Sequence, residues 1–348
     1  MAKIPVAVLG ATGMVGQRFV ELLSDHPLFE LTSLTGSERK IGQRYSDACH
    51  WVISPQPPHS TAEMVVQKSE PDIGAKIVFS ALPASIAKDI EPQFAQAGYA
   101  VCSNSSAFRD AEDVPMVIPE VNSDHLAIIS NQQDKRGWSG FIVTSPNCTA
   151  TGIVLPLKPL HDAFGVQQVL AVSMQAVSGA GYPGVPSLDI IDNVLTLIPG
   201  EEEKIEREVR ALLGGIANGR NVEADFVVSA QTNRVPVLDG HTVCLSLGFK
   251  DKPTFEAATE VLSRFRGPDA VRNLPSAPDR PIIIRTEPDR PQPRQDRDAE
   301  NGMAVSVGRI RPCPIMDLRM VSVVHNTLRG AASGSILNAE LLVAEKYV

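Results

Sequence analysis

The sequence lacks a long hydrophobic run, since no apolar stretch in it reaches the ~18 to 20 residues that a membrane-spanning helix needs. It also lacks a basic excess: 32 Lys and Arg stand against 40 Asp and Glu, a net charge of −8 at pH 7. This balance is atypical of proteins that bind nucleic acid or anionic membranes, and we expect neither partner. No hydrophobic leader with a small-residue cleavage site is recognised at the start, so a cytoplasmic protein is expected.

Cysteine is scarce and shows no pairing pattern. The chain has five cysteines, an odd number, and none of them stands in a C-x-x-C pair. This pattern argues against a disulfide framework and against a zinc motif, so we predict no metal site. A reducing compartment fits such usage, and any functional cysteine is expected to act alone.

The length of 348 residues suggests about two domains, and the 43% apolar and 21% charged content is that of an ordinary globular protein. Short apolar strands alternate with helices up to about residue 147, which predicts an α/β domain with a parallel sheet covered on both faces. Strands then follow with fewer helices, which predicts an α+β domain over 148–327. The helical segment 328–348 is expected to pack back on the first domain.

Several further elements are predicted in the second half of the chain. Residues 150–160 begin as a helix that prolines interrupt, residues 187–198 form a helix, and 201–213 form a charged amphipathic helix. The stretch 275–301 is the most loop-like.

A glycine-rich turn, GATGMVG, follows the first predicted strand and precedes a helix. Glycines at such a turn allow the backbone to approach a pyrophosphate, and the helix N-terminus offers free N–H groups. The spacing is G-x-x-G-x-x-G rather than G-x-G-x-x-G, and we predict a dinucleotide site. Its expected residues are Gly10, Thr12, Gly13, Met14, Val15 and Gly16.

The end of the second predicted strand favours NADP over NAD. NAD sites usually carry an acid about 20 residues beyond the glycines, which binds the ribose 2′-hydroxyl. Here Ser37, Arg39 and Lys40 offer donors to a 2′-phosphate. Glu38 is the one residue of this segment that does not fit a phosphate site, because its side chain is acidic. Ser37 and Arg39 are therefore predicted to bind the cofactor.

Cys148 stands between a strand end and a helix start, after Asn147. A thiol at a helix N-terminus meets positive partial charge that favours the nucleophilic thiolate. The helix N–H groups and the Asn147 amide are candidates to steady an oxyanion on a carbon bonded to sulfur. The other four cysteines are interpreted as small hydrophobic residues.

A thiolate beside a nicotinamide implies addition to an aldehyde, hydride transfer and a thioester. This chemistry needs a base, and His241 is the best candidate of seven histidines. Arg234 precedes it by seven positions, and two strands joined by a turn would bring both residues to one rim.

Several motifs in fixed order extend this pattern over essentially the full chain. They are GATGMVG (10–16), SALP (80–83), SNSSAFR (103–109), SPNCTA (145–150), SGAGYPGVPSLDIIDN (178–193), GEEEKIE (200–206), NRVPVLDGH (233–241) and HNTLRGAA (325–332). With them the chain resembles the aspartate-semialdehyde dehydrogenases, specifically their archaeal and fungal branch.

The resemblance implies roles for individual residues. It makes Cys148 the acyl-thioester cysteine, His241 the acid/base histidine and Gln175 a substrate-positioning amide beside the thiol. Substrate binding is implied for Arg234 at the carboxylate, Glu201 at the amino group, and Arg109 with Lys204 at the phosphate. Further cofactor contacts are implied for Ser80, Ala81, Leu82, Ser103, Asn104, Ser178, Gly179 and Asn326.

The function that the resemblance implies is NADP-dependent reductive dephosphorylation of L-aspartyl 4-phosphate to L-aspartate 4-semialdehyde. This step serves lysine, threonine and methionine biosynthesis. A Rossmann-type domain, a catalytic and dimerisation domain, and a homodimer or dimer of dimers are implied with it.

Three alternatives stay open at this point. Malonyl-CoA reductase shares the cysteine and the histidine, although its substrate has no amino group and an apolar residue precedes its cysteine. N-acetyl-glutamyl-phosphate reductase has a different cysteine segment. A non-catalytic dinucleotide-binding redox sensor has no need for Cys148, Arg234 and His241 together. The sequence also leaves open which acid among Glu201, Glu202 and Glu203 contacts substrate.

Overall fold

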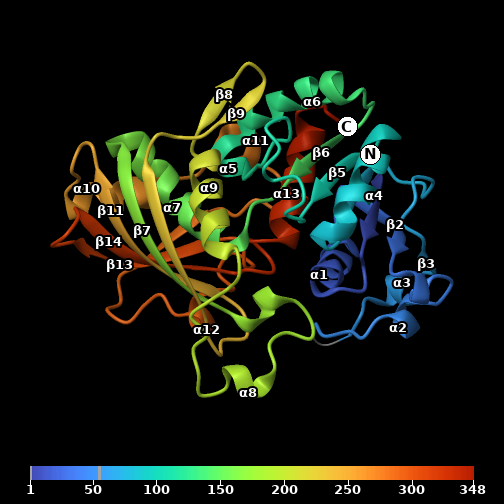
Figure 1. Ribbon diagram of the computed structural model, residues 1–348, viewed down its shortest axis with the longest axis horizontal. Helices are drawn as coiled ribbons and strands as arrows, with labels where there is room; N and C mark the ends of the chain where they lie inside the picture. Colours follow the sequence, from blue (N-terminus) through green and yellow to red (C-terminus); the bar gives the residue numbers. More distant parts are fainter. Residues whose placement is uncertain (1, 54–55) are drawn as a thin grey trace.

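The structure is a computed structural model that describes residues 2–53 and 56–348, and it holds two large sheets side by side (Figure 1). The first is a six-stranded sheet with the order β3-β2-β1-β4-β5-β6, parallel throughout. Its strands are β1 (Ile4–Leu9), β2 (Phe29–Thr35), β3 (Val66–Gln67), β4 (Ile77–Ser80), β5 (Ala100–Ser103) and β6 (Phe141–Thr144). The order reverses between β1 and β4, as in a Rossmann fold. The α/β class predicted from the sequence is confirmed.

Helices cover both faces of this sheet, and every residue of β4, β5 and β6 is therefore buried. The helices are α1 (Met14–Leu23), α2 (Tyr45–Ala48), α3 (His59–Ala62), α4 (Ala84–Gln96), α5 (Pro119–Asn122) and α6 (Ile128–Arg136), with two 3-10 turns at Glu38–Lys40 and Ser123–Ala127. The C-terminal helix α13 (Ala332–Ala344) packs against α1, β4 and β5. Its return to the first sheet is as predicted.

The second large sheet is mixed, with the order β10-β7-β11-β14-β13-β12. Its strands are β7 (Val166–Gln175), β10 (Val227–Arg234), β11 (His241–Phe249), β12 (Ile282–Arg285), β13 (Val305–Pro312) and β14 (Leu318–Val324). A small antiparallel pair joins β8 (Gly215–Ala217) to β9 (Arg220–Val222). The predicted α+β character of this half is confirmed.

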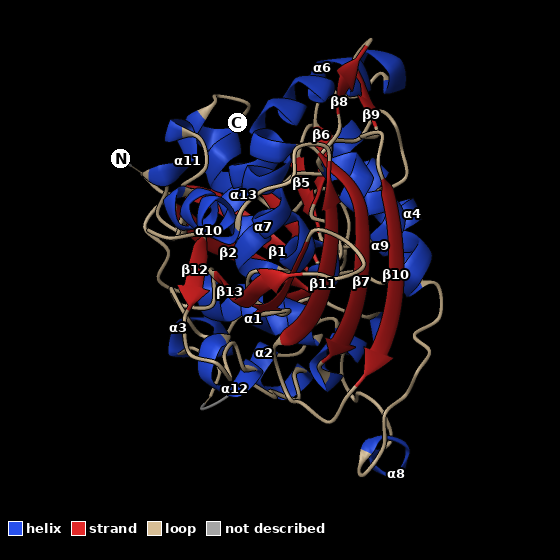
Figure 2. Ribbon diagram, turned by 90° about the vertical axis from the view of Figure 1, so that its left-hand side faces the viewer, coloured by secondary structure: helices blue, strands red, loops and turns tan. Residues whose placement is uncertain are grey.

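Helix α7 (Cys148–Phe164) packs against β7, β11, β13 and β14, and it is flanked by α9 (Glu201–Leu212) and α10 (Phe255–Arg264). The remaining helices are α8 (Ser187–Ile190), α11 (Asp269–Arg272), α12 (Pro293–Asp296) and a 3-10 turn at Val177–Ala180. Figure 2 shows the opposite face of β11, β7 and β10 turned to the viewer, with the helices behind it. Among the described residues no helix is long and apolar enough to cross a membrane.

Two helix predictions in this half are wrong. Helix α7 runs unbroken through Pro156 and Pro159, because its first turns are buried on all sides and packing offsets the backbone bonds that proline removes. The helix predicted at 187–198 is only four residues long as α8. Its apolar residues find no core, since Leu188 is 92% and Leu197 68% exposed. The loop-like stretch 275–301 contains β12, at 282–285 where the sequence also predicts a strand, and the short helix α12, which is not predicted.

Strand directions explain why distant residues meet. Strands β7 and β10 are parallel and pair Gln175 with Arg234 at their carboxyl ends. Strand β11 runs antiparallel to β7, so that its first residue, His241, starts at the same edge. At this edge the chain passes between the two sheets from β6 to α7, and again from β14 to α13.

Candidate active site

Cys148 is the first residue of α7, and Asn147 caps that helix. The Asn147 Oδ1 accepts hydrogen bonds from the backbone N–H groups of Thr149 (2.8 Å) and Ala150 (3.2 Å). This is ordinary N-cap geometry, which fixes the first turn of the helix. The thiol is half-buried at that turn.

His241 faces the thiol across a short gap, with 3.2 Å between its Nε2 and the Cys148 Sγ. On the other side of the ring, the backbone N–H of Ala176 donates to Nδ1 over 3.1 Å. Because a backbone N–H can only donate, Nδ1 is an acceptor and the proton of the neutral ring is on Nε2. The ring therefore directs an N–H at sulfur.

Burial dominates the electrostatics of this pair. It raises the pKa of Cys148 to about 12, with the Glu201 charge adding to the rise, and outweighs the opposing effects of Arg109, Arg234 and the Thr149 N–H. Burial likewise lowers the pKa of His241 to about 3, and the positive charge of Arg234 lowers it further. Without ligands, a neutral thiol faces a neutral imidazole at pH 7. This differs from the thiolate that the helix N-terminus alone favours.

A network of side chains connects this pair to the predicted substrate-binding residues. Buried Arg234 donates from Nη1 to the Ala176 carbonyl (2.9 Å) and to Gln175 Oε1 (3.4 Å). Gln175 Nε2 in turn donates to Glu201 Oε1 (3.2 Å), which also accepts from Asn147 Nδ2 (2.8 Å). A guanidinium and a carboxylate thus stand on the two sides of Gln175, beside the thiol.

The three neighbouring acids of α9 have different surroundings. Glu201 points to the thiol side, as just described. Glu202 accepts from the Thr232 backbone on β10 at 2.8 Å, and Glu203 is exposed. Lys204 lies three residues after Glu201 and so shares its helix face. Geometry therefore places Glu201, and neither of the next two acids, against Gln175.

Arg109 lies on the side of Cys148 nearer the parallel sheet. Its Nη2 donates to the Asn104 carbonyl over 2.9 Å, and its Nη1 lies 3.3 Å from Glu208 Oε1. Arg109 Nε and Asn104 Nδ2 are buried donors for which the described residues supply no acceptor. Buried donors of this kind cost stability unless a ligand accepts from them, which suits an anion. Asn104, predicted as a cofactor contact, stands with the predicted phosphate-binding arginine.

A cavity of about 790 Å³ opens at the carboxyl ends of β1 and β4. Seven predicted cofactor residues line it: Gly10, Thr12, Gly13, Ser37, Arg39, Ala81 and Leu82. Gly10 has φ +75°, and a Cβ on Gly16 would lie 2.2 Å from the Gly10 carbonyl oxygen, so both positions require glycine. Met14, Val15 and Gly16 start α1 behind the turn, while Ser80 and Ser103 are buried at the ends of β4 and β5.

Further lining residues were missed by sequence analysis, notably Lys68 and Ser69. They follow β3, a strand of two residues that is too short to leave a periodic pattern. Lys68 also forms an ion pair with Glu70.

The remaining predicted cofactor residues lie on the catalytic side. Asn326 Nδ2 donates to Ser178 Oγ, and its Oδ1 accepts from the Gly240 N–H, both at 2.8 Å. A Cβ on Gly179 would lie 2.7 Å from Arg234 Nη1 and 3.0 Å from His241 Cε1. These residues therefore border the Cys148–His241 pair, where the reactive end of a dinucleotide is expected.

Comparison with known proteins agrees with this arrangement. Residues 5–129 match the family described as semialdehyde dehydrogenase, NAD binding domain, and residues 157–329 match semialdehyde dehydrogenase, dimerisation domain. A protein of Archaeoglobus fulgidus named aspartate-semialdehyde dehydrogenase is 52% identical, over 99% of this chain and 100% of its own. The chain belongs to the aspartate-semialdehyde dehydrogenase family.

Other members of the aspartate-semialdehyde dehydrogenase family extend the likeness. The protein of that name from Schizosaccharomyces pombe is 48% identical, over 99% of each chain. The crystal structure of aspartate semialdehyde dehydrogenase with NADP from Candida albicans has a TM-score of 0.92 and 41% identity, over 100% of both chains.

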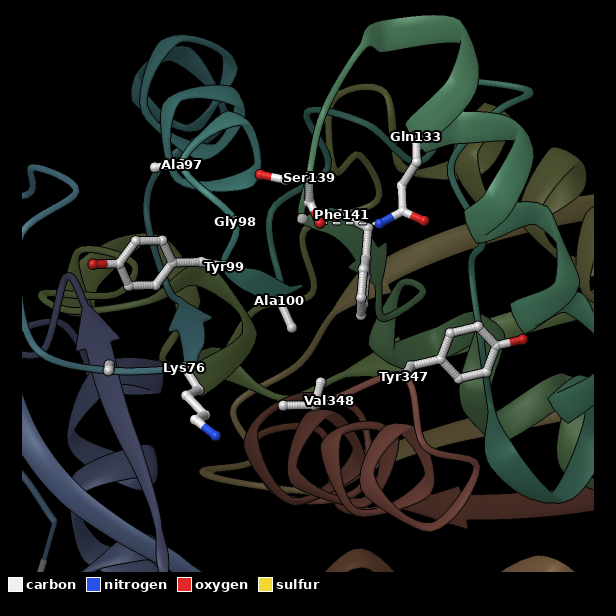
Figure 3. Close-up of a pocket in the computed structure, with 12 residues that line it drawn as sticks. Lys76, Ala97, Gly98, Tyr99, Ala100, Gln133, Ser139, Phe141, Tyr347 and Val348 are labelled. Carbon is white, nitrogen blue, oxygen red and sulfur yellow. Dashed lines mark hydrogen bonds between the residues drawn. The ribbon is translucent and has the colours of Figure 1, made fainter.

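A second cavity, of about 460 Å³, lies away from the residues predicted for an aspartate-semialdehyde dehydrogenase (Figure 3). Lys76, Tyr99 and Phe141 line it at the amino ends of β4, β5 and β6, with Gln133 and Tyr347 facing them. None of the predicted site residues lines it. Ligands of open α/β sheets bind at the carboxyl ends of the strands, which is the other edge.

The neutral thiol leads to a prediction about alkylation. Since the pKa of Cys148 is about 12 in the ligand-free protein, only the small thiolate fraction reacts, and the iodoacetamide rate should rise about tenfold per pH unit from pH 6 to 9. Peptide mass spectrometry at Cys148 measures this rate, with Cys148→Ala as the blank. A rate independent of pH over that range would mean that the thiolate is already formed.

Proposed function

We propose that the protein is an NADP-dependent aspartate-semialdehyde dehydrogenase, which converts L-aspartyl 4-phosphate to L-aspartate 4-semialdehyde and phosphate or catalyses the reverse. The observation that carries the proposal is the 3.2 Å approach of Cys148 Sγ to His241 Nε2, beside Arg234 and Glu201. Family membership supports the same reaction.

The amino-acid end of the substrate has matching groups in the site. The Arg234 guanidinium suits a bidentate salt bridge with the α-carboxylate, and the Glu201 carboxylate suits the ammonium. Gln175 bridges these two residues and so sets their separation. Arg109 and Lys204 supply positive charge for the phosphate.

The covalent step assigned to Cys148 is acyl transfer. In the biosynthetic direction the S–H bond and the carbon–oxygen bond to phosphate break as Sγ bonds to the acyl carbon, so that phosphate departs with the thiol proton and a thioester is left. NADPH, when bound, supplies hydride to that carbon. The carbon–sulfur bond then breaks, the aldehyde is released, and the leaving sulfur takes up a proton that passes from solvent through His241.

Substrate binding also adjusts His241. Part of the lowering of its pKa comes from the Arg234 charge, which a bound carboxylate offsets. The bound state therefore holds a more basic imidazole than the empty site, which is what proton transfer requires.

The rival reading as malonyl-CoA reductase is not favoured. The malonyl-CoA substrate has no ammonium group, whereas the Glu201 carboxylate, hydrogen-bonded to Gln175, suits one. A redox sensor would have no use for the Arg234, Gln175 and Glu201 network.

The direct test is turnover by the purified protein. NADP⁺ should be reduced with aspartate semialdehyde and phosphate, while malonyl-CoA should not support NADPH oxidation. Cys148→Ala should lower turnover by more than about 1000-fold and keep NADP binding, because the covalent route is lost and the cavity of Gly10 is untouched. Efficient malonyl-CoA reduction, or Cys148→Ala activity within tenfold of wild type, would refute the proposal.

We further propose that Ser37 and Arg39 select NADP. Both residues line the cavity at the turn after β2. Arg39→Ala removes a charged donor to the 2′-phosphate, a loss of about 1.5 to 3 kcal/mol. The NADP Kd should rise at least tenfold and the NAD Kd less than twofold, measured by calorimetry. Lys40→Ala is the matched control, because Lys40 does not line the cavity; equal losses for both cofactors would assign Arg39 to loop support alone.

Assembly as a homodimer or a dimer of dimers is also proposed, through the sheet face turned to the viewer in Figure 2. This face exposes apolar side chains to solvent: Leu170 is 41% and Val227 66% exposed, and Cys244 is also exposed. The match of residues 157–329 to a dimerisation domain supports it.

A charge on that face should separate the subunits. Leu170→Asp buries an unpaired carboxylate at the proposed interface, and sedimentation at micromolar concentration should shift from dimer or tetramer to monomer. Val65→Asp, at a 51% exposed site next to β3 at the edge of the first sheet, should leave the wild-type species. A wild-type monomer would overturn the assembly.

All five cysteines are unpaired, which is compatible with the reducing compartment expected from the sequence. We therefore propose that the enzyme is cytoplasmic.

A further inference from the structure

The α9 helix carries a buried acid, Glu208, for which neither the reaction nor the sequence motifs provide a role. Its side chain is 0% exposed, and it lies seven residues after Glu201 and four after Lys204 on the same helix face. A carboxylate at that depth is costly unless it is paired and hydrogen-bonded. What it touches therefore indicates why it is there.

Each carboxylate oxygen of Glu208 has one partner, and the two partners belong to different parts of the site. Oε1 lies 3.3 Å from Nη1 of Arg109, in the loop after β5. Oε2 accepts the backbone N–H of Asn147, the residue before the nucleophile, over 2.5 Å. One planar group thus joins the predicted phosphate-binding cation to the turn that presents sulfur.

The other buried acid near Arg109 does not replace this link. Glu91 accepts from Ser103 Oγ at 2.7 Å, and burial raises its pKa to about 7. No hydrogen bond joins Glu91 to Arg109 in the described part of the chain. Glu208 is therefore the acid that holds the Arg109 guanidinium.

We infer that Glu208 is a positioning residue that fixes the phosphate-binding guanidinium of Arg109 relative to Cys148. The inference rests on the proposed function and deepens it, since it names the residue that sets the distance between the phosphate site and the thiol. In the reverse reaction, a phosphate oxygen attacks the thioester carbon and the carbon–sulfur bond breaks. This step needs the phosphate bound by Arg109 to lie close to the acyl carbon on Cys148. Hydride transfer from the thiol adduct does not need phosphate.

Glu208→Gln tests the link with little change of shape. An amide keeps one oxygen acceptor but turns its NH₂ group toward either Arg109 or the Asn147 N–H, both of which are donors. One of the two contacts is then lost. Glu206→Gln is the matched control on the same helix, since Glu206 accepts a backbone N–H from Ala230 and contacts neither Arg109 nor Asn147.

Two readouts separate positioning from folding. Mixing enzyme with aspartate semialdehyde and NADP⁺ without phosphate gives a burst of NADPH that counts sites with a working Cys148. Steady-state turnover gives the KM for phosphate. For Glu208→Gln we expect a burst amplitude within about 20% of wild type. The KM for phosphate should rise at least about tenfold, while the KM for aspartate semialdehyde should change less than about threefold. Glu206→Gln should match wild type in all three measurements.

Other results of the same measurements would contradict the positioning role of Glu208. An unchanged KM for phosphate in Glu208→Gln, or the same rise in Glu206→Gln, overturns the inference. If Glu208→Gln does not fold, Glu208→Asp is measured instead; it keeps the charge but is too short to reach both partners, and the same criteria apply. A wild-type protein without any burst refutes the proposed function rather than the role of Glu208.

Discussion

The first turn of α7 depends on Asn147, whose polar groups are all hydrogen-bonded. Its Oδ1 caps the helix, its carbonyl accepts from Thr151, and its Nδ2 and backbone N–H donate to Glu201 and Glu208. The proposed nucleophile, Cys148, is the next residue, so its position is set by two carboxylates of another helix as well as by its own backbone. Helix α9 therefore serves as the common support for the thiol and for the groups proposed to bind substrate.

The same burial that fixes these groups shifts the pKa values of Cys148 and His241 toward their neutral forms. Desolvation holds Cys148 as a thiol and His241 as a neutral ring, although a helix N-terminus and two arginines favour the thiolate. The proposed substrate brings a carboxylate and a phosphate, which would change the local charge at Arg234 and Arg109. On that proposal the reactivity of this half-buried thiol depends on the bound substrate.

The features that could be predicted from the amino-acid sequence are those whose cause is local. The GATGMVG turn could be located because Gly10 and Gly16 need backbone conformations or contacts that other residues cannot provide, and apolar periodicity located the strands. The continuous α7 was missed because buried packing overrides proline, and α8 was overestimated because its apolar residues have no core in this chain. Glu208 escaped notice since it reads as one more acid on a charged helix; its partner Asn147 is 61 residues away.

The connection after β14 passes beside the connection before α7, and a glycine makes that approach possible. A Cβ on Gly330 would lie 2.5 Å from the Cys148 Cβ and 2.8 Å from the Asn326 carbonyl oxygen. Any larger residue there would displace either the backbone that carries the thiol or the backbone of a predicted cofactor contact. A residue without a side chain thus sets how closely these two parts of the site approach each other.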